Sequence, residues 1–150
     1  MRPRIFPPVI ALITAGLMYL LDSYFPLVRL WEEPWNKAGL ALMAIAIVID
    51  VWSLLLFFIH RTTPHPLKPE KTSKLVTGGM YQFTRNPMYL GLLLLLTGLA
   101  VYMGSLTPIV MLPLFVMVLT NRQILHEELI LEEKFGEEYR AYKQRVRRWF

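Results

Sequence analysis

The segment YQFTRNPMYLGLLLLLTG (residues 81–98) joins a polar cluster directly to an apolar run. Its first half carries an arginine, an asparagine, a proline and two tyrosines, and its second half contains five consecutive leucines. Asparagine is a preferred N-cap residue and proline is favoured at the first helical position, so a helix should begin near Pro87 or Met88. The segment therefore predicts a membrane span with polar groups at its water-facing start.

Apolar runs of similar length occur elsewhere in the chain, which has 150 residues and is 55% hydrophobic. A membrane helix needs about 20 apolar residues. We predict one all-α integral membrane domain (residues 1–150) with four spans, at about residues 5–21, 38–59, 88–103 and 107–120. The chain has no cysteine, which excludes disulfides and thiolate catalysis.

The positive charges are distributed unevenly between the two sides of these spans. Of the 16 lysines and arginines, only Arg29 and Lys37 fall between the first two spans. The positive-inside rule then places both termini and the segments 61–87 and 121–150 in the cytoplasm. Basic residues beside apolar spans also indicate an anionic membrane surface as their partner rather than nucleic acid.

The two cytoplasmic segments differ in their local patterns. Three prolines in RTTPHPLKPEK (residues 61–71) favour an extended path, and two glycines in VTGGMY (residues 76–81) allow a tight turn or a close approach to a ligand. In the tail, apolar residues recur at spacings of three or four. This spacing predicts an amphipathic helix lying under the bundle, with a bend at Gly136.

Charged groups in these segments could form a binding site. The helix N-terminus at Asn86, next to Arg85, would attract an anion. Glu128 falls on the helix face of Phe135 and Tyr139, where a carboxylate needs a partner. An anion site beside the pair Glu127 and Glu128 would suit a zwitterion such as an α-amino acid head group. The structural alternatives are that Asn-Pro only starts a helix, that Arg85 reaches lipid head groups, and that the two glutamates are solvated.

Two blocks, KTSKLVTGGMYQFTRNPMYLG (residues 71–91) and HEELILEEKFGEEYRAYKQRVRRW (residues 126–149), resemble the isoprenylcysteine carboxyl methyltransferase and phospholipid methyltransferase superfamily. The resemblance implies a small membrane enzyme that uses S-adenosylmethionine. It also implies a lipid-like acceptor: a prenylcysteine carboxylate, a phospholipid amine, or a lipophilic thiol or acid. The carboxyl methyltransferases proper have histidine where Asn86 stands, and the asparagine form resembles a bacterial branch, which implies a bacterial or archaeal cytoplasmic membrane.

The resemblance also implies roles for individual residues. No cluster of metal ligands is visible in the sequence, so we expect no metal. Glu127 matches the cofactor-binding glutamate, whereas helix geometry alone favours Glu128, so both remain candidates. Arg122 is nearest to an arginine that contacts the acceptor, and it joins Arg85 as a catalytic candidate. The residues implied to bind the cofactor are Ser73, Lys74, Leu75, Val76, Tyr81, Asn86, Pro87, Met88, Tyr89, Glu127 and Glu128.

Asp50 lies inside the second predicted span, where a charge is costly. It is either functional or bonded to a neighbouring helix. A functional Asp50 would also suit a different class of protein, a four-span proton-coupled transporter of small molecules. His60, His65 and His126 are further candidates for a general base.

The end of the tail is expected to close over the cofactor. Tyr139, Tyr142, Val146 and Trp149 share one helix face, which we expect to meet residues 74–81. The tail cations are expected on lipid phosphates, where each contributes about 1 kcal/mol. They are Arg140, Lys143, Arg145, Arg147 and Arg148.

Overall fold

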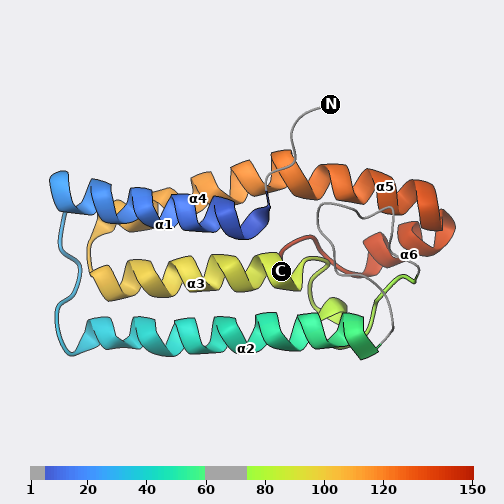
Figure 1. Cartoon of the computed structure of the whole chain (residues 1–150), viewed down its shortest axis with the longest axis horizontal. Coiled ribbons are helices and arrows are strands. Elements are labelled where there is room, and N and C mark those ends of the chain that lie inside the picture. The colour runs from blue at the N-terminus through green and yellow to red at the C-terminus, as the bar shows by residue number, and fades with distance from the viewer. Residues whose placement is uncertain (1–5, 60–73) are drawn as a thin grey trace.

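Four long helices run side by side in the computed structural model, which describes residues 6–59 and 74–150 (Figure 1). The candidates Ser73, His60 and His65 lie outside the described residues. Helix α3 lies between α2 on one side and the pair α1 and α4 on the other. No β-strand longer than an isolated bridge occurs in the described ranges. The four helices are α1 (Pro7–Tyr24), α2 (Ala38–Ile59), α3 (Pro87–Met103) and α4 (Leu106–Leu119).

The helix bounds follow the predicted spans closely. The bounds of α2 match the prediction, whereas α1 continues three residues beyond the predicted end at Leu21. In the described ranges, three helical segments are long and apolar enough to cross a membrane, and α3, with 17 residues, is a shorter apolar helix. Large apolar side chains such as Leu12 and Val48 face outward, as lipid-facing residues do. The chain is therefore an integral membrane protein.

Glycines let α2 and α3 approach each other closely. A Cβ atom on Gly39 would lie 2.2 Å from the carbonyl oxygen of Gly98, and a Cβ atom on Gly98 would lie 2.7 Å from the carbonyl oxygen of Gly39. Two helices can touch through their backbones only where both side chains are this small. This contact fixes α2 along α3.

The hairpin between α3 and α4 is held by the end of α1 and by the segment that joins α1 to α2. Gly104 ends α3 with a positive φ of 77°, a conformation that suits glycine. The Trp31 side chain donates a hydrogen bond to the carbonyl oxygen of Val101 (2.6 Å), and the Ser105 hydroxyl donates one to the Asp22 carboxylate. These bonds tie the end of the bundle that lies away from the polar segments.

The tail differs from the prediction of an amphipathic helix lying under the bundle. A π-helical turn, η4 (Thr120–Ile124), joins α4 directly to α5 (Leu125–Phe135), and α5 continues in line with α4 (Figure 1). The prediction was wrong for α5 because this turn continues the helix of the fourth span without a break. The bend at Gly136 (φ 50°) is confirmed, and α6 (Glu137–Arg145) folds back so that the C-terminus lies near the start of α3.

Candidate active site

The start of α3 is the point where the polar segments meet. Asn86 is the N-cap residue, and its carbonyl oxygen accepts hydrogen bonds from the backbone N–H groups of Tyr89 (3.0 Å) and Leu90 (2.9 Å). Pro87 is the first residue of the helix, as predicted. The Asn86 side chain does not cap the helix. Its amide donates to the carbonyl oxygen of Arg148 (3.0 Å), which ties the tail to the start of α3.

Glu127 is held by two donors from different helices. The Tyr89 hydroxyl donates to Glu127 Oε1 (2.6 Å), and Gln123 Nε2 donates to the same oxygen (2.5 Å). Gln123 belongs to the π-helical turn and is almost fully buried. Single π-helical turns inside α-helices often mark functional sites. Gln123 was not predicted from the sequence, although an amide four residues before a carboxylate is a recognisable signal.

Glu128 faces two arginines in a separate buried cluster. Arg148 donates two hydrogen bonds to its carboxylate, from Nε and Nη2, each 2.8 Å long. Arg85 Nη1 lies 3.0 Å from Glu128 Oε1, and the side chains of Arg85 and Glu128 are only 9% and 8% exposed. Because two guanidinium groups share one carboxylate, the cluster carries a net positive charge. Glu128 therefore has the partner that its position on an apolar face requires.

Arg85 retains hydrogen-bonding capacity despite this ion pair. Its buried Nε and Nη1 atoms make no hydrogen bond with acceptable geometry to any residue in the described ranges. Buried guanidinium donors are rarely left unsatisfied. The unsatisfied donors suit an additional anionic group, such as a carboxylate.

Three of the four residues predicted for the aromatic face of the tail meet the segment before α3, as expected. Trp149 instead packs against the core of the bundle and donates to the Thr120 hydroxyl (3.2 Å). Tyr139, Tyr142 and Val146 pack with Val76 and Tyr81 in one buried cluster, and Leu75 packs against its edge. The Tyr142 hydroxyl donates to the carbonyl oxygen of Tyr81 (2.6 Å). Burial raises the pKa of Tyr139 to about 12 and that of Tyr81 well above its ordinary value. Both phenols are therefore neutral near pH 7.

Three of the tail cations form ion pairs within the chain. Arg148 binds Glu128, and Arg140 and Lys143 bind the two oxygens of Glu132 at 3.1 and 2.8 Å. These pairs form because the turn at Gly136 brings α6 back to the carboxylates of α5, and the contact of the cations with lipid phosphates stays a prediction. Arg145 and Arg147 remain exposed.

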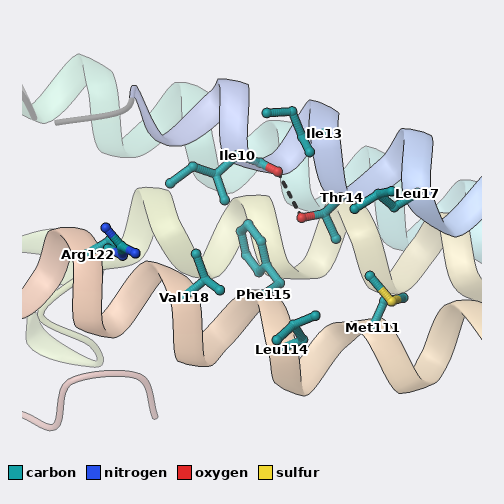
Figure 2. A pocket seen from close by; sticks show the side chains of 9 residues that line it. All are labelled: Ile10, Ile13, Thr14, Leu17, Met111, Leu114, Phe115, Val118 and Arg122. Carbon is teal, nitrogen blue, oxygen red and sulfur yellow. Dashed lines mark hydrogen bonds between the residues drawn. The ribbon is translucent and has the colours of Figure 1, made fainter. Parts of the chain in front are cut away.

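Arg122 lies on a different side of the helix from Gln123. It stands at one end of a pocket of about 330 Å³ between α1 and α4 (Figure 2). The pocket is otherwise apolar except for Thr14, whose hydroxyl donates to the carbonyl oxygen of Ile10 (2.8 Å). Its other lining residues are Ile10, Ile13, Leu17, Met111, Leu114, Phe115 and Val118.

The remaining candidates are placed as follows. Lys74 is exposed, and Met88 is half-buried in the first turn of α3. Asp50 lies against Gly91 of α3, and its Oδ1 atom is buried without a hydrogen-bond partner in the described ranges. Within those ranges, no three histidine, aspartate or glutamate side chains gather as a metal site would require.

Comparison with known protein families identifies the class of this small helical membrane protein. The family model described as phospholipid methyltransferase matches residues 35–138. The match spans more than half of the chain, so the chain belongs to the phospholipid methyltransferase family. It is a methyltransferase, and the resemblance that we inferred from the two sequence blocks is confirmed.

Similar proteins support the same class. An uncharacterized protein of Haemophilus influenzae is 47% identical over 62 residues, which are 41% of this chain and 98% of that protein. A protein of Oryza sativa subsp. indica named "Probable protein-S-isoprenylcysteine O-methyltransferase" is 28% identical over 141 residues, 92% of this chain and 72% of that protein. Methanethiol S-methyltransferase 1 of Bradyrhizobium diazoefficiens is 36% identical over 145 residues, 87% of this chain and 49% of that protein. These similarities give no support to a transporter.

Proposed function

We propose that the protein transfers a methyl group from S-adenosylmethionine to a lipophilic acceptor at the start of α3. The observation that supports this most is the convergence of two separated segments on that helix N-terminus. Tyr89 and Gln123 hold Glu127, while Arg85 and Arg148 hold Glu128. Membership of a methyltransferase family supplies the reaction type.

The amino acid portion of the donor fits the charges at this site. Glu127 would receive the α-ammonium group, and the buried donors of Arg85 would receive the α-carboxylate, helped by the positive end of the α3 dipole. Asn86, Pro87 and Met88 would form the floor around this head group. Once bound, the cofactor supplies a sulfonium that carries an electrophilic methyl group.

The rest of the donor would lie along the segment before α3. Ser73, Lys74, Leu75, Val76 and Tyr81 would line it, and α6 would cover it, because Tyr142 already binds the backbone of Tyr81. A neutral Tyr81 phenol adds no charge next to the sulfonium. Excluding water here strengthens every electrostatic contact at the reacting groups.

The acceptor would approach from the bilayer through the pocket between α1 and α4 (Figure 2). Its apolar walls suit a hydrocarbon chain, and Arg122 at the end of the pocket would bind a polar head group. The reacting group of the acceptor would extend beyond Arg122 to the start of α3, where Tyr89 holds Glu127. The acceptor class includes prenylcysteine-like carboxylates, phospholipid amines and lipophilic thiols or acids.

We further propose that both termini and the polar segments face the cytoplasm of a bacterial or archaeal membrane, as the charge distribution predicts. S-adenosylmethionine would then enter from water and the acceptor from lipid. Holding the two reactants about 3–3.5 Å apart can remove several kcal/mol from the barrier.

Methyl transfer from labelled S-adenosylmethionine tests this function. The purified protein in lipid nanodiscs is incubated with the label, and total lipid, protein and volatile fractions are counted. We expect label in at least one fraction, reduced at least about tenfold by Glu127→Gln, which removes a charge-assisted contact. Glu133→Gln, which changes an exposed glutamate of the same helix, serves as the matched control. Absence of transfer into all three fractions would contradict the proposal.

A further inference from the structure

We propose that Asp50 is the general base that takes the proton from the acceptor, and that the acceptor is therefore a thiol or an amine rather than a carboxylate. This inference rests on the proposed function and names the acceptor chemistry of the same site. It comes from an acidic residue of α2 whose buried Oδ1 atom has no hydrogen-bond partner in the part of the chain that the structure describes.

The position of Asp50 is built into the contact between α2 and α3. Asp50 shares the packed face of α2 with Ala46 and Ser53, which are fully buried. On α3 it meets Gly91, where a Cβ atom would lie 1.9 Å from Asp50 Oδ1. Only glycine at position 91 leaves room for the carboxyl group at this point. The side chain is thus held in place by packing.

One oxygen of the Asp50 carboxyl group has no hydrogen-bond partner among the described residues. Its Oδ1 atom is buried and makes no hydrogen bond to any residue in the described ranges, whereas Ser53 on the same face donates to the carbonyl oxygen of Ile49 (2.7 Å). A charge inside a membrane helix is costly and usually functional. An acidic residue that served only to join two helices would be bonded to the second helix.

Asp50 also lies close to the proposed reaction centre. Gly91 follows Tyr89 by two residues on α3. The pKa of Tyr81 is raised first by burial and then by the charges of Tyr142, Glu127 and Asp50. Both carboxylates therefore act electrostatically on the Tyr81 phenol. Tyr89 donates to Glu127 and Gly91 lies against Asp50, so the two carboxylates meet α3 within one helical turn of each other. Glu127 is assigned to the cofactor, which leaves Asp50 for the acceptor.

The proton balance of the transfer gives Asp50 its role. Asp50 accepts the proton of the acceptor's S–H or N–H bond, and the freed electron pair of sulfur or nitrogen forms the new bond to the methyl carbon. The carbon–sulfonium bond breaks, its electrons go to sulfur, and a neutral thioether leaves. A carboxylate acceptor has no proton to give and would be repelled by Asp50.

Two thiols of different acidity test this role in the purified protein with S-adenosylmethionine. A long-chain alkyl thiol is protonated at pH 7, and a long-chain aromatic thiol is mostly ionised. We expect Asp50→Asn to slow transfer to the alkyl thiol by about 100-fold or more, as loss of a general base does, and transfer to the aromatic thiol by less than about fivefold. A long-chain amine should behave like the alkyl thiol. Asp50→Glu should retain more activity than Asp50→Asn, and Ser53→Ala, the matched control, should leave every rate unchanged.

Binding of S-adenosylhomocysteine to each variant separates the possible failures. The inference requires that Asp50→Asn bind it as the wild type does. The inference is overturned if Asp50→Asn methylates the alkyl thiol at nearly the wild-type rate, if both thiols and cofactor binding are lost together, or if the wild type methylates only carboxylates. A wild type that binds no S-adenosylhomocysteine contradicts the proposed function itself.

Discussion

Glu128→Gln should release the end of the tail, and the structure gives the size of the effect. The carboxylate is 8% exposed and compensates Arg85, which is 9% exposed, and Arg148, which is 34% exposed. Removing one member of a buried ion pair costs about 3–5 kcal/mol. Arg148 can move into solvent, so we attribute the cost mainly to Arg85 and use the lower limit, about 3 kcal/mol. Since every 1.4 kcal/mol is a factor of ten, the detached tail should become about 100-fold more populated.

Trypsin cleavage after Arg145 and Arg147 measures that population. Both side chains are exposed, but the backbone beside them is held, because the N–H group of Arg85 donates to the carbonyl oxygen of Arg147 (2.9 Å). When reclosing is faster than cleavage, the cleavage rate follows the open fraction. We expect cleavage about 100-fold faster in Glu128→Gln. Glu133→Gln should be cut at the wild-type rate. If Glu128→Gln is also cut at that rate, the cluster does not hold the tail.

Two further predictions concern the contact between α2 and α3 and the end of the tail. Gly98→Ala should lower the thermal unfolding temperature in detergent, because its Cβ would lie 2.7 Å from the Gly39 carbonyl oxygen and overpacking costs about 1–3 kcal/mol. Gly16→Ala should leave that temperature unchanged, because a Cβ at Gly16 would have nothing within 4 Å. Equal unfolding temperatures for the two variants would refute the close contact. Deleting residues 139–150 should weaken S-adenosylhomocysteine binding at least about tenfold, since the part of the tail that would cover the cofactor is lost. The truncated protein should still sediment with membranes. If the truncated protein binds S-adenosylhomocysteine with unchanged affinity, the tail serves only as an anchor.

The transmembrane part of the fold could be predicted because apolar runs are local signals. The cation at Lys37 and the pair Asn86-Pro87 mark where α2 and α3 begin, and the structure places both starts there. The direction of the tail could not be predicted in this way. Helical spacing shows which residues share a face, but it does not tell whether α4 and α5 form one rod.

Some features of the candidate site could likewise be predicted from the sequence, and others could not. The N-cap position of Asn86 and the unusual place of Glu128 on an apolar face could be found from sequence because both are properties of one helix. The bond from Gln123 to Glu127 depends on the register of the π-helical turn, and the approach of Arg148 to Glu128 depends on the fold-back at Gly136. Contacts between distant segments need the tertiary structure.

Titration of the purified protein with S-adenosylhomocysteine tests the central claim most directly. We expect saturable binding in the micromolar range by the wild type. Glu127→Gln should weaken it by about 10- to 100-fold, which corresponds to the loss of one hydrogen bond to a charged group. Glu133→Gln should bind as the wild type does. A wild type that does not bind, or a Glu127→Gln variant with unchanged affinity, would contradict the assignment of the cofactor site to the start of α3.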